Sequence, residues 1–281
     1  MSIFLICVIA LSSSSLTYGN FASASTGAAN FLPNYYYKGS GTFDTANEIS
    51  LSLSTAKYIT TQLSTKYPSS YFAAYETNCN LANYQSVTSY LQNYDNAVVF
   101  SKGHRDVSSG HYALLDHYAV DFWDSDIYGR TSSKNKVTFI WHCETAYPYN
   151  YNGNNMDANN KAVGMPFAWT HNNQMIKYGA GSTSSYGNQV YLGWDMFYGL
   201  PLYNGTTLAM VASPQYEWKA SYNNDYADVA MYFWSYMRQG YSVSDSLNKV
   251  SYLCYSNIMP FDYCPLKGWL VYYGNGAIGL P

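Results

Sequence analysis

Apolar runs of strand length alternate with helix-like segments along this chain, and this alternation limits its fold more than any other feature. Runs rich in aromatic and β-branched residues indicate strands, and apolar residues at helical spacing indicate helices. Strands separated by helices imply a mainly parallel sheet covered on both faces. The sequence therefore predicts an α/β fold, a three-layer sandwich with a mainly parallel sheet. The predicted strands are "NYYYKG", "SSYFAAYET", "NAVVFS", "VTFIW", "NQVYLGW" and "GWLVYYG", and the predicted helices are residues 45–65 and 80–94 and two within 223–254.

Local signals refine this outline in two places. The segment "HYALLDHYAVDFWD" contains two alternating runs suited to a hairpin or to edge strands. In residues 223–254, Gly240 is expected to end the first helix and Ser244 to cap the second.

Two predicted strands end beside residues that can carry out chemistry. His104 follows "AVVFSKG", and Cys143 follows "VTFIWH". Ligands bind beyond the carboxyl ends of the strands in parallel sheets, so His104 and Cys143 face one crevice if their strands are neighbours. An imidazole close to a thiol favours the thiolate and can protonate a leaving group. Backbone N–H groups around Gly103 and Glu144 could supply an oxyanion hole.

The two motifs resemble those of a known fold family. The segments "VVFSKGH" and "VTFIWHCETA", separated by a hairpin, are similar to the caspase-like fold of the clan CD cysteine peptidases, which include caspases, legumain, gingipain and clostripain. Arg105 stands where the family usually has Gly, and His142 where it has a small residue, so the chain looks like a divergent relative. The resemblance implies one caspase-like domain over residues 25–281. It also implies a cysteine endopeptidase without a cofactor, in which Cys143 attacks protein or peptide substrates and His104 is the general acid and base.

The first 24 residues read as a secretory signal peptide, because an apolar stretch is followed by small residues. The protein is then expected to be secreted, either free outside the cell or held at its surface. No later window reaches the run of about 18 apolar residues that a membrane span needs.

Four cysteines remain beyond the signal peptide, and their pairing is open. In an oxidising exterior, Cys254 and Cys264 are close enough in sequence to close a loop by a disulfide. Cys143 is then a nucleophile, a buried packing residue or a partner of Cys79. A bond to Cys79 would exclude the nucleophile.

Composition leaves a second function open. Charged residues make up 11% of the chain, against about 25% in ordinary proteins, and 33 tyrosines supply much of the polarity. The alternative is therefore a non-catalytic extracellular surface or carbohydrate-binding protein, whose tyrosine-rich face meets cell-surface components. The net charge of −3, without a basic run, argues against nucleic acid as a partner.

Three further features are weaker. Asp195, at the end of a predicted strand, could line a specificity pocket for a basic side chain. His142 is expected to be a hydrogen-bonded core histidine. The histidines and aspartates of the predicted hairpin lack metal-ligand spacing, so no metal is predicted; they are His111, His117, Asp116, Asp121 and Asp124.

Overall fold

A six-stranded sheet runs through the protein in the order β2-β1-β3-β7-β8-β9. The first five strands are parallel to their neighbours, and β9 is antiparallel to β8. The strands are β1 Thr26–Leu32, β2 Tyr71–Tyr75, β3 Asn96–Lys102, β7 Asn135–Trp141, β8 Val190–Trp194 and β9 Leu270–Gly274. The computed structural model describes residues 24–33, 46–148, 154–173, 176–179, 186–195, 226–254, 260–264, 266–267 and 270–281.

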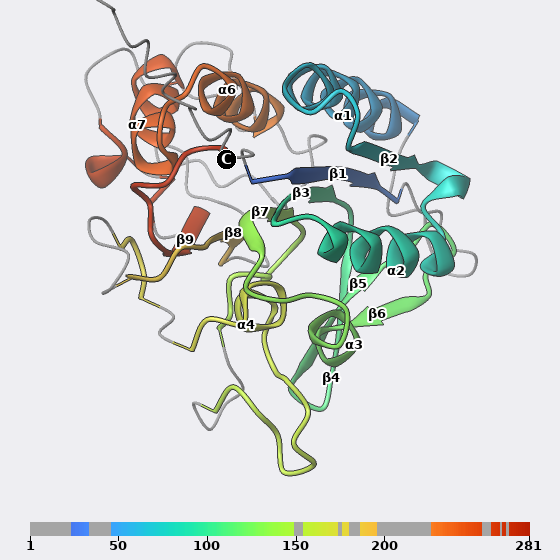
Figure 1. Ribbon diagram of the computed structural model, residues 1–281. Coiled ribbons are helices and arrows are strands. Elements are labelled where there is room, and N and C mark those ends of the chain that lie inside the picture. Colours follow the sequence, from blue (N-terminus) through green and yellow to red (C-terminus); the bar gives the residue numbers. More distant parts are fainter. Residues whose placement is uncertain are drawn as a thin grey trace, which may run out of the picture.

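Helices cover both faces of this sheet (Figure 1). On one face, α1 Ala46–Lys66, α6 Tyr226–Arg238 and α7 Val243–Cys254 share an apolar core with the sheet. On the other lie α2 Leu81–Tyr90, α3 Asp124–Tyr128 and α4 Met165–Thr170. The described residues also include three single 3-10 turns, η1 Glu76–Asn78, η2 Leu91–Asn93 and η3 Phe261–Tyr263. The predicted three-layer α/β architecture is confirmed.

The centre of the sheet explains why its strands read as continuous apolar runs. Along β7, Phe139 and Trp141 pack on the α1/α6/α7 side, whereas Ile140 packs on the α2/α4 side. All three are at most 1% exposed. A strand covered on both faces needs apolar residues at every position, and alternation is lost.

A small antiparallel sheet follows β3, in the order β4-β5-β6. Its strands are β4 Arg105–Ser108, β5 His111–Leu115 and β6 Asp121–Trp123. The predicted hairpin is confirmed as β5 and β6. The additional strand β4 escaped prediction because "RDVS" is short and polar. The Ser109-Gly110 turn that joins it to β5 has positive φ at both residues, as a type I′ hairpin turn requires.

The first strand differs from the prediction. Residues 34–39, "NYYYKG", lie outside the described part of the chain, and the first described strand is β1, "TGAANFL". Its small residues have weak strand propensity, but packing requires one of them, Gly27. A Cβ on Gly27 would collide with the ring of Tyr94.

The helix ends near the C-terminus are partly as predicted. Gly240, with φ of +95°, follows α6 as expected. The predicted cap at Ser244 is wrong, because Ser242 caps α7 instead: its hydroxyl accepts the Asp245 N–H (3.1 Å) and donates to the Asp245 carboxylate (2.7 Å).

The predicted signal peptide falls almost wholly on residues 1–23, outside the described residues. Across the helices that the structure describes, none combines the length and the apolar character that crossing a membrane requires.

Candidate functional site

The ends of β3 and β7 bring the two predicted catalytic residues to one edge of the sheet. The strands are hydrogen-bonded parallel neighbours, with Lys102 opposite Trp141. His104 and Cys143 each follow two residues beyond these paired positions. The condition on which the shared crevice depended, that the two strands are neighbours, is therefore met.

Cross-strand contacts continue past the last paired residues. The Gly103 N–H donates to the Trp141 carbonyl (3.2 Å), and the carbonyl of His104 accepts the Leu115 N–H (3.0 Å). The same carbonyl lies 2.6 Å from Nδ1 of His142. His142 is fully buried, so its prediction as a hydrogen-bonded core histidine agrees with these contacts.

Gly103 has a packing role at this edge. A Cβ there would lie 2.8 Å from Cε1 of His142 and 2.9 Å from Cγ of Pro33. Its N–H is engaged with Trp141, so this amide is not the oxyanion donor that the sequence suggested. Of the two backbone amides expected to form an oxyanion hole, that of Glu144 remains the candidate.

The cysteines do not pair in the way that would exclude catalysis. Cys79 and Cys143 are both buried and are not joined, and no disulfide links the three cysteines that the structure describes with their side chains, Cys79, Cys143 and Cys264. Burial raises the pKa of the Cys79 thiol well above its ordinary value. The predicted Cys254–Cys264 bond involves the side chain of Cys254, which lies outside the described part.

Arg105 and Glu144 form an ion pair beside Cys143. Their side chains are 11% and 23% exposed, and Glu144 has a left-handed backbone with φ of +48°. Burial lowers the pKa of Arg105, whereas the negative charges of the Cys143 thiolate and of Tyr112 act to raise it. The Arg105 guanidinium is therefore close enough to Cys143 for their charges to interact.

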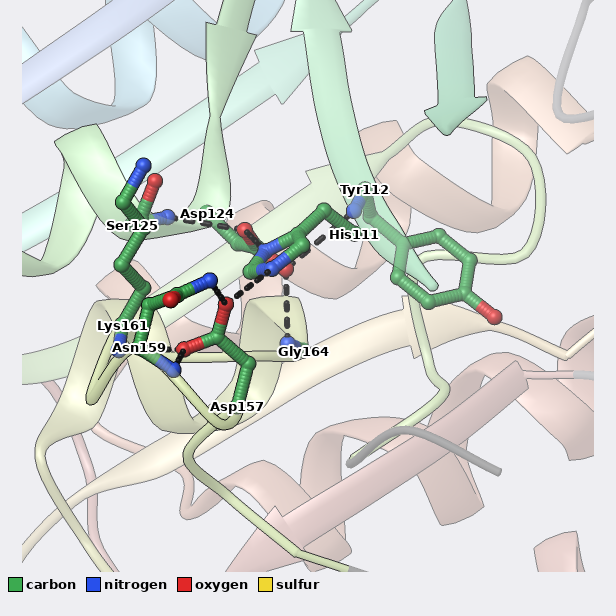
Figure 2. A network of polar contacts seen from close by, with 8 residues as sticks. All are labelled: His111, Tyr112, Asp124, Ser125, Asp157, Asn159, Lys161 and Gly164. Atoms are coloured by element: carbon green, nitrogen blue, oxygen red, sulfur yellow. Dashed lines mark hydrogen bonds and ion pairs between the residues drawn. The ribbon is translucent and has the colours of Figure 1, made fainter. Parts of the chain in front are cut away.

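A second polar cluster anchors the chain that follows Cys143 (Figure 2). His111 Nδ1 lies 2.7 Å from Oδ1 of the fully buried Asp124, and His111 Nε2 lies 3.4 Å from Oδ2 of Asp157. Asp124 Oδ2 also accepts the N–H groups of Tyr112 (3.2 Å) and Gly164 (2.8 Å). These contacts tie the segment 157–164 to β5 and α3.

Tyr147 adds another contact between the chain that follows Cys143 and β5. Its ring stacks on that of Tyr112, with the ring centroids 5.9 Å apart and an interplanar angle of 10°. A surface cavity of about 390 Å³ lies beside His111 and Asp157, and neither His104 nor Cys143 lines it. No group of three or more His, Cys, Asp or Glu in the described residues is arranged to hold a metal.

Asp195 follows β8 at the same edge of the sheet, because Ile140 pairs with Gly193 in the β7–β8 register. Its carboxylate lies 3.5 Å from Nζ of Lys177, and the two side chains are 26% and 48% exposed. A half-exposed ion pair of this kind contributes up to about 1 kcal/mol.

Sequence reasoning missed the Arg105–Glu144 pair and the link from His111 to Asp124. Charged residues at Arg105 and Glu144 directly beside the two motifs were visible, but nothing in the sequence says that they face one another. His111 and Asp124 stand at the two ends of the predicted hairpin, where cross-strand proximity could have been inferred.

Comparison with known proteins yields a distant structural likeness. No family model matches the chain, and no curated protein matches it. The crystal structure of the Drosophila initiator caspase Dronc matches with a TM-score of 0.39 and 10% sequence identity, over 99% of this chain and 94% of that chain. A likeness this distant assigns neither a family nor an activity.

The carboxylates around His111 make the stability of the protein depend on pH. Burial acts to lower the pKa of His111, but contacts with Asp124 and Asp157 raise it above its ordinary value overall. A raised folded-state pKa gives stability that is complete below the unfolded value, about 6.5, and is lost as the pH rises through the folded value.

His111→Asn keeps an uncharged donor near the Nδ1 position. We expect the difference in unfolding free energy between wild type and this variant to fall as the pH rises above about 6.5. Urea unfolding from pH 5.5 to 8.5 measures it, and a difference independent of pH would contradict the linkage.

Proposed function

We propose that this protein is a cysteine endopeptidase in which Cys143 is the nucleophile and His104 the general acid and base. The observation that carries the proposal is the register of β3 and β7, which brings both residues to one edge of the sheet at the same level. A second observation supports it: Cys79 and Cys143 are not joined by a disulfide, so the Cys143 sulfur is not blocked by Cys79.

The reaction follows ordinary thiol chemistry. The Cys143 thiolate forms a bond to the peptide carbonyl carbon, His104 gives a proton to the leaving amine, and the C–N bond breaks to leave an acyl thioester. His104 then takes a proton from water, the water oxygen bonds to the acyl carbon, and the C–S bond breaks to release the acid and regenerate the Cys143 thiolate beside protonated His104. These steps need no cofactor, and the substrates are proteins or peptides.

Arg105 and Glu144 set the electrostatics of the nucleophile. The positive charge of Arg105 favours the Cys143 thiolate, and the carboxylate of Glu144 opposes it by pairing with the same guanidinium. Glu144 also stands in a left-handed conformation directly after Cys143, and strained backbone of this kind is frequent at active sites. We assign the oxyanion role to the Glu144 N–H.

The alternative, a surface protein with a tyrosine-rich binding face, lacks a comparable observation in the described structure. Exposed tyrosines are spread over several elements of the described structure, and two of them, Tyr58 and Tyr90, lie on α1 and α2, which cover opposite faces of the sheet (Figure 1). We propose secretion, or retention at the cell surface, from the first 24 residues alone; mass spectrometry of the mature protein should find its N-terminus after residue 24.

The dyad is tested by alkylation of Cys143 with iodoacetamide as a function of pH, followed by mass spectrometry. We expect reaction well below pH 8.5, the reference value of a thiol, and loss of this reactivity in His104→Ala. The same variant should lower peptide hydrolysis about 100-fold or more, and Cys143→Ser should abolish it. If Cys143 reacts slowly and His104→Ala changes nothing, the peptidase proposal fails and the surface-protein alternative becomes the working hypothesis.

The ion pair is tested with two charge-removing variants. Arg105→Gln should shift the alkylation midpoint of Cys143 upward by about one pH unit, and Glu144→Gln should shift it downward, because each removes a charge of opposite sign beside the thiolate. Lys136→Gln, which removes the same charge at the opposite end of β7, is the matched control and should leave the midpoint unchanged. Equal shifts in Arg105→Gln and Lys136→Gln would show only a general charge effect.

The specificity role proposed for Asp195 predicts a preference for basic side chains. In a pair of peptides that differ only by Lys against Gln, Asp195→Asn should lower the kcat/KM preference for Lys by a factor of about five, as expected for a partly exposed ion pair. Lys177→Gln should raise the preference, since it removes the competing cation. An unchanged ratio in both variants would refute the pocket.

A further inference from the structure

A chain of buried hydrogen bonds ends at the backbone of His104. The hydroxyl of Tyr84, in α2, lies 2.5 Å from Oγ of Ser101, in β3. Ser101 Oγ lies 2.8 Å from Nε2 of His142, and Nδ1 of His142 lies 2.6 Å from the carbonyl oxygen of His104. Tyr84, Ser101 and His142 are all 0% exposed, so water does not compete for these bonds.

The protons in this chain have one consistent arrangement. The carbonyl of His104 can only accept, so Nδ1 of His142 carries a hydrogen. Burial lowers the pKa of His142 to about 3, and the ring is therefore neutral, with Nε2 as an acceptor. Ser101 must then donate to Nε2, and Tyr84 must donate to Ser101 Oγ.

The arrangement fixes the peptide group that carries His104. Its carbonyl receives two donors, His142 Nδ1–H from the β7 side and the Leu115 N–H from β5. Both donors come from ordered elements, so the backbone at His104 has little freedom to turn. Catalysis by a general acid and base is sensitive to displacements of about 1 Å, and such anchoring preserves the geometry.

We propose that His142 is a positioning residue, which holds the backbone of His104 so that the His104 ring stays directed at Cys143. The inference rests on the proposed function of His104 and Cys143. It assigns to His142 no contact with substrate.

Two variants separate this role from packing. An asparagine amide nitrogen lies near the place of Nδ1, and a glutamine amide reaches the place of Nε2, where its oxygen can accept from the Ser101 hydroxyl. His142→Asn therefore keeps a donor for the His104 carbonyl, whereas His142→Gln loses it and keeps the contact with Ser101. Ser251→Ala removes a buried hydroxyl in α7 that takes no part in this chain of hydrogen bonds. It is the control for a loss of stability alone.

The readout is the pH profile of Cys143 alkylation. The charged groups beside Cys143 in the described structure are Arg105 and its partner Glu144, and Arg105 also interacts electrostatically with Tyr112, Asp106 and Tyr147. We expect His142→Asn and Ser251→Ala to keep the wild-type profile. His142→Gln should lose the His104-dependent reactivity at neutral pH and move toward the reference thiol value of about 8.5. If the loss of reactivity in each variant parallels its loss of melting temperature, the proposal is overturned. It is also overturned if His142→Asn and His142→Gln have the same profile.

A measurement on the wild-type protein does not depend on any variant folding. Nitrogen NMR of labelled histidine should find one ring protonated on Nδ1 and not titrating between pH 5 and 8. If the His142 ring is protonated on Nε2, or titrates in this range, the assignment is overturned. If His104→Ala leaves alkylation unchanged, the proposed function fails and the positioning role fails with it. If His104→Ala acts while the Asn and Gln variants are alike, only the positioning role fails.

Discussion

The pairing of β3 with β7 is the contact on which the rest of the site depends. Both strands lie in the middle of the sheet. The ring of Phe100 in β3 packs against those of Phe139 in β7 and Trp234 in α6, with ring-centroid distances of 5.7 Å and 6.1 Å. A one-residue slip would send these aromatic side chains to the opposite core. The register is therefore fixed by packing on both faces, and the level at which the two chains leave the sheet is fixed with it.

Just past this pairing, Gly103 leaves room for the buried ring of His142. The ring fits because Gly103, on the neighbouring strand end, has no Cβ to meet it. Once buried, His142 needs partners for both nitrogens, since an unsatisfied polar group costs about 1–3 kcal/mol. Ser101 and the His104 carbonyl provide them.

The small sheet β4-β5-β6 connects the two sides of the site. It begins at Arg105, directly after His104, and Arg105 reaches back to the residue after Cys143. His111, in β5, holds the later part of the same loop through Asp124 and Asp157 (Figure 2). The segments that follow His104 and Cys143 are thus tied to one another outside the main sheet.

The sequence by itself determined the layered α/β architecture and the positions of His104 and Cys143 at strand ends, because periodicity and residue type are local properties that survive in any tertiary arrangement. It did not locate β1, where the glycine at position 27 is explained by the ring of Tyr94 packed against it. Strand order, the ion pair of Arg105 with Glu144 and the hydrogen bonds of His142 were decided by tertiary structure. Each joins residues far apart in the chain or in different elements, and their partners follow from burial and register, which no local pattern encodes.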